Sequence, residues 1–316
     1  MNSAVTPPTI LVTGGAGFIG SSLVDSLLRM NYRVRVFDNL DSGYVQYLDF
    51  VHPNLEFIHG DVLDKESVYA SMINVSGVFH LAASSKTGNF PQEATLNVQV
   101  NAVGTTNVLE AAVASTTVKR FVYVGSSAYY GDDQDTFPGD PFSASSSQAT
   151  SKFMGELITA NYDKLFNLPT ISVRFFGVFG PRQPVHGAYA PVRFLHNPSL
   201  LPNFLHVNEV VNGLLKTYNS TIRGTAIFLG KHEQVSPEHL SRMINSYNPS
   251  SIDSFETRGQ FTRSFSEGEF QHTASSWNLF AEDLSQKFPG WVEMTPEAQS
   301  AVIAAYIRDE TTFSDI

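Results

Sequence analysis

Three glycines near the start of the chain have the spacing of a phosphate-binding loop. Gly14, Gly17 and Gly20 follow a short apolar run and precede a stretch with helical periodicity. The first glycine permits a tight turn, the second lets a pyrophosphate approach the backbone, and the third lets helix and strand pack closely. The N-terminus of the helix offers free N–H groups and the positive end of a dipole to the phosphates. The pattern therefore predicts a dinucleotide-binding loop.

An acidic residue stands where such a site needs one. Asp38 ends the second predicted strand, about twenty residues beyond the glycines, where it would accept hydrogen bonds from a ribose diol. Asn39 follows, at a place where an NADP site more often offers arginine, so the sequence favours NAD. Ala16, Phe18 and Ile19 complete the part of the loop that we expect to contact this cofactor.

The elements that position this loop follow from hydrophobic periodicity. β-Branched apolar runs predict strands, and apolar residues at helical spacing predict the helices between them. The predicted strands are residues 9–13, 33–37, 55–58, 77–81, 120–124, 170–174 and 225–229, and the predicted helices are 18–30, 101–114, 146–162, 207–218, 237–246 and 296–309. Such alternation implies right-handed crossovers and a parallel sheet covered on both faces. The expected fold class is α/β, a Rossmann-type doubly wound parallel sheet with a smaller, irregular C-terminal substrate lobe.

The periodic pattern loosens after residue 176, which suggests a division into domains. Glycine, proline, histidine and aromatic residues crowd residues 177–202. We expect an NAD-binding domain over residues 1–176, to which 204–230 return, and a substrate lobe made of 177–203 and 231–316. Open α/β sheets bind their ligands at the carboxyl edge of the sheet, so we expect the lobe to lie there.

Composition excludes several classes of function. The 316 residues include no cysteine, which rules out disulfides, a cysteine nucleophile and thiolate-bound metals. A net charge of −10 argues against a nucleic-acid or anionic-membrane surface and favours a small-molecule substrate. The nine histidines show no metal-binding spacing. No signal peptide or membrane-spanning stretch is evident, so we expect a cytoplasmic protein.

Further motifs give the chain a family resemblance. They lie at residues 13–20, 37–39, 59–62, 80–83, 101–105, 126–131, 151–152, 174–181 and 204–207. In this order they resemble the extended short-chain dehydrogenase/reductase family, the NAD-dependent sugar-nucleotide epimerases and dehydratases. The resemblance implies that Asp61 and Val62 hold the adenine and that Leu81, Ala82 and Ala83 line the cofactor path. It also suggests a homodimer formed through the helices predicted over 101–114 and 146–162.

The resemblance also implies a catalytic set. In this family a tyrosine four residues before a lysine couples hydride transfer to proton transfer, and the lysine holds the nicotinamide ribose and lowers the pKa of the phenol. Lys152 matches the lysine, Ser126 matches the serine that binds the reacting oxygen, and Asn101 matches the asparagine that supports a water chain. The tyrosine position holds Gln148, whose amide does not titrate in the accessible range.

Several side chains are candidates to replace the missing tyrosine. His186 lies in a glycine-flanked loop expected to border the substrate, and histidine has the most suitable pKa. Tyr129 and Tyr189 are also candidates near the nicotinamide, although Tyr129 is equally compatible with a purely structural role.

Two departures fall in the predicted substrate lobe. Gly177 stands where relatives that use sugar nucleotides carry an asparagine, and Pro202 stands where they carry an arginine that binds the diphosphate. A diphosphate needs charge-assisted donors. The leading hypothesis is therefore an NAD-binding enzyme with a non-standard active site, acting on an unusual, non-nucleotide small molecule by redox, isomerase, lyase or cyclase chemistry. The alternatives are a catalytically inactive NAD-binding pseudoenzyme with a regulatory or partner-subunit role, and a sugar-nucleotide 4-epimerase or dehydratase with a substitute general base.

Overall fold

The chain divides into two compact units in a computed structural model, which describes residues 7–85, 91–126, 129, 146–175, 177–183 and 204–229. One unit comprises Met1–Arg174 with Gly213–Phe228, and the other comprises Phe175–Asn212 with Leu229–Ile316. The first unit contains nearly all of the main sheet. The second contains a short pair of strands.

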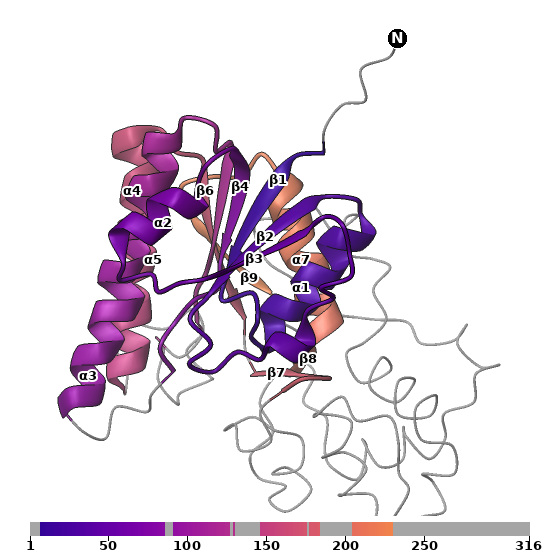
Figure 1. Ribbon diagram of the computed structural model, residues 1–316. Helices are drawn as coiled ribbons and strands as arrows, with labels where there is room; N and C mark the ends of the chain where they lie inside the picture. The colour runs from indigo at the N-terminus through magenta and orange to yellow at the C-terminus, as the bar shows by residue number, and fades with distance from the viewer. Residues whose placement is uncertain are drawn as a thin grey trace, which may run out of the picture. The chain divides into compact units, whose positions relative to one another are not determined.

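The main sheet has seven strands within the described residues, in the order β3-β2-β1-β4-β5-β6-β9 (Figure 1). They are β1 (Thr9–Thr13), β2 (Arg33–Asp38), β3 (Leu55–His59), β4 (Val75–His80), β5 (Arg120–Val124), β6 (Thr170–Phe175) and β9 (Ala226–Leu229). Every pairing from β3 across to β6 is parallel. The strand order reverses at β1 and β4, where Thr13 pairs with both Phe37 and His80. The expected fold class, a doubly wound parallel sheet of the Rossmann type, is confirmed.

Helices cover both faces of this sheet. They are α1 (Phe18–Arg29), η1 (Val45–Tyr47), α2 (Lys65–Ser71), α3 (Pro91–Val98), the π-helix η2 (Gln99–Gly104), α4 (Thr105–Ser115), α5 (Ser147–Phe166) and α7 (Val207–Asn219). Figure 1 shows α2, α4 and α5 on one side of the sheet and α1 with α7 on the other. This two-sided cover explains why the central strands are apolar along their whole length.

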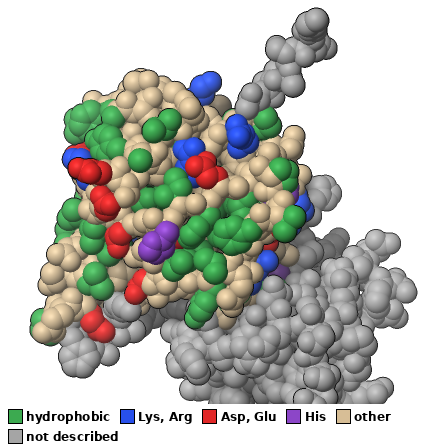
Figure 2. Space-filling model, viewed as in Figure 1, with side chains coloured by type: hydrophobic (Ala, Val, Ile, Leu, Met, Phe, Trp, Pro, Cys, Tyr) green, Lys and Arg blue, Asp and Glu red, His purple; other side chains and the backbone are tan. Residues whose placement is uncertain are grey.

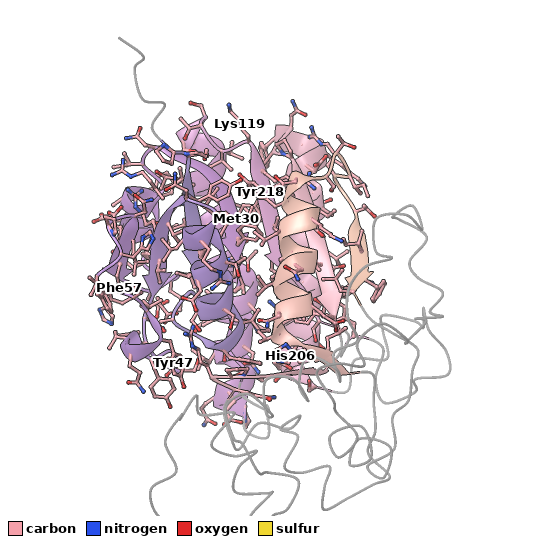
Figure 3. The ribbon with its side chains drawn as sticks, turned by 90° about the vertical axis from the view of Figure 1, so that its right-hand side faces the viewer. Met30, Tyr47, Phe57, Lys119, His206 and Tyr218 are labelled. Atoms are coloured by element: carbon pink, nitrogen blue, oxygen red, sulfur yellow. The ribbon has the colours of Figure 1, made fainter. Side chains whose placement is uncertain are left out.

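Each face of the sheet has its own packing. On one face, Val108, Leu109 and Ala112 of α4 are buried against apolar residues of the strands, including Leu11 and Phe121. On the other face, Tyr218 of α7, which Figure 3 labels, stacks on Phe79 of β4 with ring centroids 5.1 Å apart. A Cβ on Gly77 would lie 2.2 Å from the Tyr218 hydroxyl oxygen, so the glycine admits this ring.

The observed elements differ from the predicted ones in a few places. The helix predicted over 101–114 is the C-terminal part of a longer run in which the π-helix η2 joins α3 to α4. Helices α2 and α3 were too short and too weakly periodic for the sequence to predict them. The helices predicted over 237–246 and 296–309 lie outside the described residues.

The described part of the second unit is small. Strand β7 (Gly177–Phe179) pairs in parallel with β8 (Phe204–His206), and the Gln183 side-chain amide donates to the Val178 carbonyl oxygen at 2.9 Å.

Acidic and basic side chains are interspersed on the described face that Figure 2 shows. Among the helices whose placement is described, none has the length and apolar character needed to span a bilayer.

Candidate active site

The glycine loop joins β1 to α1 and is pressed against the loop that follows β4. Gly14 has a φ of +70°, which favours glycine, and a Cβ at this position would lie 2.6 Å from the Ala82 backbone nitrogen. A Cβ on Gly20 would lie 2.1 Å from the Gly14 carbonyl oxygen. These two glycines therefore bring the ends of β1, α1 and β4 together at the point where the strand order reverses, which is where such sheets bind ligands.

The N-terminus of α1 has the features of an anion-binding site. Its N-cap is Gly17, no side chain caps it, and its first turn contains no acidic residue. Phe18 and Ile19 stand in this first turn and are half-buried. Backbone N–H groups and the positive end of the helix dipole are therefore left for an external acceptor, and a pyrophosphate fits that need.

Asp38 connects the glycine loop to the end of β2. Its side chain is buried, and its two carboxylate oxygens accept from the Ala16 N–H at 2.9 Å and the Leu40 N–H at 2.8 Å. Each carboxylate oxygen can accept a second hydrogen bond. The two backbone bonds fix the carboxylate beside the loop, as binding of a ribose diol requires.

The residues expected at the adenine end form a second fixed group. The Asn39 amide donates to Asp61 Oδ2 at 2.9 Å, and the Leu63 N–H donates to Asp61 Oδ1 at 2.9 Å. Val62 points into the core, where a Cβ on Gly104 would lie 2.5 Å from its Cγ2. Any contact of Val62 with the cofactor therefore has to come from its backbone.

A chain of hydrogen bonds runs behind the loop that follows β4. The Ala82 N–H donates to Thr13 Oγ1 at 3.3 Å, and Thr13 Oγ1 lies 2.7 Å from Nδ1 of the fully buried His80. His80 Nε2 lies 2.9 Å from Thr105 Oγ1, which itself donates to the Asn101 carbonyl oxygen at 2.7 Å. Because Thr105 Oγ1 donates to Asn101, it accepts from His80 Nε2, and in a neutral His80 the Nδ1 atom then accepts from Thr13 Oγ1. Burial first, and then the Lys152 charge, lower the pKa of His80 to about 3.

Asn101 lies in the π-helix, a type of helical irregularity that is frequent at functional sites. Its amide donates to the Ser84 carbonyl oxygen at 3.0 Å and to Ser151 Oγ at 2.9 Å, and its Oδ1 accepts from the Ser84 N–H at 2.8 Å. Both amide hydrogens are therefore used within the protein. Asn101 joins the β4 loop, which continues from Leu81 through Ala83, to α5, and only its Oδ1 retains capacity for a water.

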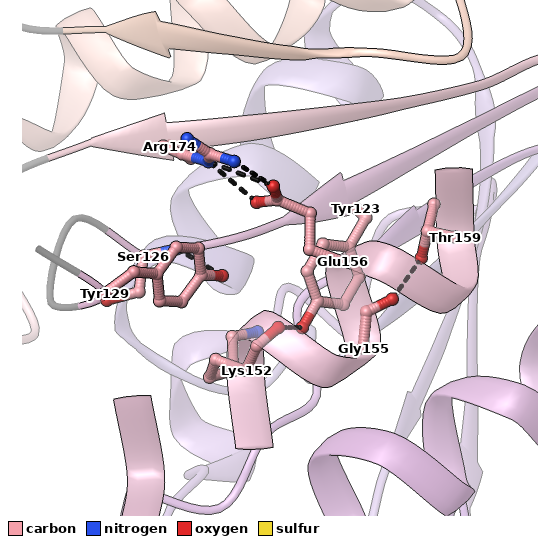
Figure 4. Close-up of polar contacts among 8 residues, drawn as sticks. All are labelled: Tyr123, Ser126, Tyr129, Lys152, Gly155, Glu156, Thr159 and Arg174. Atoms are coloured by element: carbon pink, nitrogen blue, oxygen red, sulfur yellow. Dashed lines mark hydrogen bonds and ion pairs between the residues drawn. The ribbon is translucent and has the colours of Figure 1, made fainter. Parts of the chain in front are cut away.

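Lys152 is buried on α5 against the carboxyl end of β5. Its Nζ donates to the Val124 carbonyl oxygen at 2.5 Å and lies 4.4 Å from the Tyr123 ring centroid, and the Tyr123 hydroxyl donates to the Lys152 carbonyl oxygen at 2.8 Å (Figure 4). Burial lowers the pKa of Lys152 to about 7, while the Glu156 carboxylate acts in the opposite direction. Two further ammonium hydrogens remain for a ribose.

Ser126 follows β5, two residues beyond the oxygen that Lys152 contacts. Its N–H donates at 3.0 Å to the hydroxyl of Tyr129, which is fully buried. Burial, more than any neighbouring charge, raises the pKa of Tyr129 far above its ordinary value. This environment keeps the Tyr129 phenol protonated and favours a structural role over proton transfer.

Gln148 lies one turn before Lys152 on α5 and is half-buried. Its carbonyl oxygen accepts from Ser151 Oγ at 2.9 Å. The structure thus brings Ser126, Lys152 and Asn101 together at the ends of β4 and β5, with Gln148 on the same helix as Lys152. His186 and Tyr189 lie outside the described residues.

Two residues of this region have no role in the sequence analysis. Glu156 lies one turn after Lys152, and its carboxylate binds Arg174 of β6 in a buried ion pair (Figure 4). The i, i+4 spacing from Lys152 is the signal by which Glu156 could have been found. Across the described ranges, no group of three or more histidine, aspartate or glutamate side chains is arranged to hold a metal ion.

The strand order, the glycine loop with Asp38 and the lysine-bearing helix define a nicotinamide-dependent enzyme fold of the extended short-chain dehydrogenase/reductase class. Residues 10–221 match the NAD dependent epimerase/dehydratase family, and the chain belongs to that family. NAD is the cofactor, and the bare α1 N-terminus and the oriented Asp38 carboxylate fit it.

Relatives named for UDP-sugars are similar to this chain in sequence or in structure. The chain is 29% identical over 262 residues to the UDP-N-acetyl-alpha-D-glucosaminuronate decarboxylase of Bacillus cytotoxicus. The matched region covers 76% of this chain and 80% of the relative. It superposes on Thermotoga maritima UDP-glucose 4-epimerase with UDP-glucose at a TM-score of 0.66 and 27% identity, covering 76% and 83% of the two chains. A variant of Bacillus cereus UDP-glucuronic acid 4-epimerase, in complex with UDP-4-deoxy-4-fluoro-glucuronic acid and NAD, gives 0.66 at 25% identity, covering 74% and 81%.

Proposed function

We propose that this protein is an NAD-dependent enzyme that acts at a hydroxyl-bearing carbon of a UDP-sugar and transfers the proton without an active-site tyrosine. The observation that carries the proposal is the buried Lys152, held by the Val124 carbonyl oxygen beside Ser126 and one turn after Gln148. The Val124 carbonyl oxygen uses one of the three ammonium hydrogens of Lys152, which leaves two donors for a ligand at the carboxyl end of the sheet.

Each residue of the site has a distinct task in this proposal. The glycine loop and Asp38 hold NAD, whose nicotinamide takes up a hydride when the cofactor is bound. Lys152 binds the nicotinamide ribose, and the Ser126 hydroxyl binds the reacting oxygen of the substrate. The Gln148 amide can orient that oxygen, but it cannot accept its proton. We propose His186 as the proton acceptor, because the burial of Tyr129 argues against Tyr129 in that role.

The substrate class rests on the relatives. The decarboxylase and both epimerases are named for UDP-sugars. None of them supports the non-nucleotide molecule that Gly177 and Pro202 predict. We therefore propose a UDP-sugar, bound without the asparagine and the arginine that are typical of this family, and we expect weaker binding of the diphosphate.

A substrate panel tests the proposal. Protein is incubated with NAD and separately with UDP-glucose, UDP-N-acetylglucosamine and UDP-glucuronic acid, and products are identified by chromatography and mass spectrometry. We expect a new UDP-sugar from at least one substrate, and its loss in Lys152→Met. Turnover of a non-nucleotide polyol, with all three UDP-sugars unchanged, would overturn the substrate class.

The second candidate is a cofactor-binding protein without turnover, and Gln148 is the observation that favours it. General acid–base help contributes about 10²–10⁴-fold to such reactions, so its loss could abolish activity. This candidate predicts NAD binding, no product from the panel even for Gln148→Tyr, and capture of a partner protein from the source extract.

We also propose that the protein forms a homodimer through η2 and α5. Val103 of η2 and Met154 and Leu157 of α5 are large apolar side chains with 50%, 38% and 51% of their surface exposed. Exposed apolar side chains on the two helices suit an interface with a second copy. Light scattering of the protein as it leaves a size-exclusion column should give a molar mass twice the 34.7 kDa of one chain. The substitution Leu157→Glu should reduce the measured mass to that of a single chain.

A further inference from the structure

A buried ion pair joins α5 to β6 next to Gly125, the residue before Ser126. Arg174 Nε donates to the two Glu156 carboxylate oxygens at 3.1 and 2.9 Å, and its terminal nitrogen also contacts Oε1. The Glu156 side chain is 6% exposed and that of Arg174 is 12% exposed. A bidentate, buried pair of this kind fixes both side chains, and removing either partner leaves an uncompensated charge.

The pair is coupled to Ser126 through aromatic contacts. The Arg174 guanidinium contacts two rings, with its carbon 5.4 Å from the Tyr129 centroid and 4.9 Å from the Phe228 centroid. The Tyr129 hydroxyl in turn accepts the Ser126 N–H (Figure 4). A Cβ on Gly125 would lie 2.8 Å from Glu156 Oε2, so the backbone next to Ser126 also abuts the carboxylate.

Glu156 also acts on Lys152 through its charge. The two residues are one turn apart on α5, and the carboxylate opposes the effect of burial on the pKa of Lys152. Within the described part of the chain, the other ionisable groups beside Lys152 are Tyr123 on β5 and His80 on β4. Burial raises the pKa of Tyr123 well above its ordinary value and lowers that of His80 to about 3, so both are neutral near pH 7.

We propose that Glu156 is a positioning residue for this site: its carboxylate holds Arg174 against Tyr129 behind Ser126, and it stands one turn from Lys152, the residue that binds the nicotinamide ribose. The inference rests on the proposed function, since it assigns a task within the same site. It is tested by cofactor binding, however, so a failure of turnover leaves it unaffected.

The experiment measures the pH dependence of NADH affinity by calorimetry in four proteins. In the wild type, affinity falls as pH rises through the Lys152 pKa of about 7. In Glu156→Gln the midpoint of that fall should move to lower pH by at least about 0.5 unit. Glu156→Asp keeps the charge and should stay near the wild type. Glu110→Gln is the matched control, because it removes a carboxylate that pairs with Lys65 on the surface.

A further variant guards against loss of folding. Glu156→Gln leaves the Arg174 charge buried without its partner, whereas Glu156→Gln with Arg174→Met leaves no unpaired charge and keeps an apolar stem against the Tyr129 ring. The double variant should also show a downward movement of the midpoint, smaller than that of Glu156→Gln because the positive charge of Arg174 is removed as well. A folded double variant with the wild-type midpoint would overturn the proposal. So would an equal movement in Glu110→Gln, because the effect would then reflect overall charge.

Discussion

Substituting Gly20 by alanine is the sharpest test of how the cofactor loop is built. The new methyl group would lie 2.1 Å from the Gly14 carbonyl oxygen, 2.8 Å from the Gly15 Cα and 2.9 Å from the Gly14 carbonyl carbon. All three are backbone atoms, so no side chain can rotate away. The start of α1 has to separate from the loop by about 1 Å to reach ordinary contact distance.

The expected cost follows from this displacement. Overpacking against an unyielding neighbour costs about 1–3 kcal/mol. Moving the Gly14 carbonyl oxygen also weakens the bond that it accepts from the Gly17 N–H at 3.2 Å, a contribution of about 1 kcal/mol. Alanine has a better helix propensity than glycine, which offsets up to about 1 kcal/mol of this loss in stability. We therefore expect a net loss of about 2 kcal/mol in the free energy of unfolding, and NADH affinity at least about ten-fold weaker because the phosphate loop is displaced.

Gly17→Ala is the matched control. Gly17 has φ −79° and ψ 179°, which any residue adopts, and its new Cβ would lie 3.3 Å from the Gly14 carbonyl oxygen. Its unfolding free energy should stay within about 0.5 kcal/mol of the wild type, while its methyl group obstructs the pyrophosphate and weakens NADH binding. Urea unfolding without cofactor and NADH titration measure the two effects. A Gly20→Ala protein as stable as the wild type would refute the packing argument.

Two other substitutions test the Asp38 carboxylate and the buried His80. Asp38→Asn replaces one of the two carboxylate oxygens that accept backbone N–H groups by an amide donor, so the free energy of unfolding without cofactor should fall by about 1–3 kcal/mol. The affinity for NADH, measured by titration, should fall as well. An unchanged stability and affinity would contradict the role of Asp38 in holding the loop and the cofactor ribose. His80 is neutral in the fold with a pKa of about 3, so its contribution to stability is complete above the unfolded pKa of about 6.5 and is lost as pH falls toward 3. His80→Gln should therefore flatten the decline in unfolding free energy below pH 6.5 by up to about 1.4 kcal/mol per pH unit, and an equally steep decline would show that His80 is not its source.

The cofactor half of the site could be predicted because its requirements are local in sequence. Gly14, Gly17, Gly20 and Asp38 each meet a demand set by a strand end or a helix start, and the strand–helix alternation places them at one edge of the sheet. The π-helix at Asn101 could not be predicted from periodicity, because it spans only Gln99–Gly104, which is too short a segment to show an apolar period of its own.

The surroundings of the catalytic residues depend on contacts between distant segments. Tyr129 was a candidate from its neighbourhood in sequence, but only the fold shows that its hydroxyl accepts the Ser126 N–H and is buried. Glu156 and Arg174 are 18 residues apart and on different elements, so their pairing has no local signal. The absence of a titratable group at Gln148, in contrast, is visible in the sequence alone.

The central claim is that hydride transfer in this site proceeds without a tyrosine and is slow for that reason. The most direct measurement is the rate at which reduced nicotinamide absorbance appears when NAD-loaded protein is mixed with each UDP-sugar of the panel, for the wild type and for Gln148→Tyr. We predict a slow rise in the wild type and one on the order of 10²-fold faster in the variant. A variant no faster than the wild type would contradict the claim.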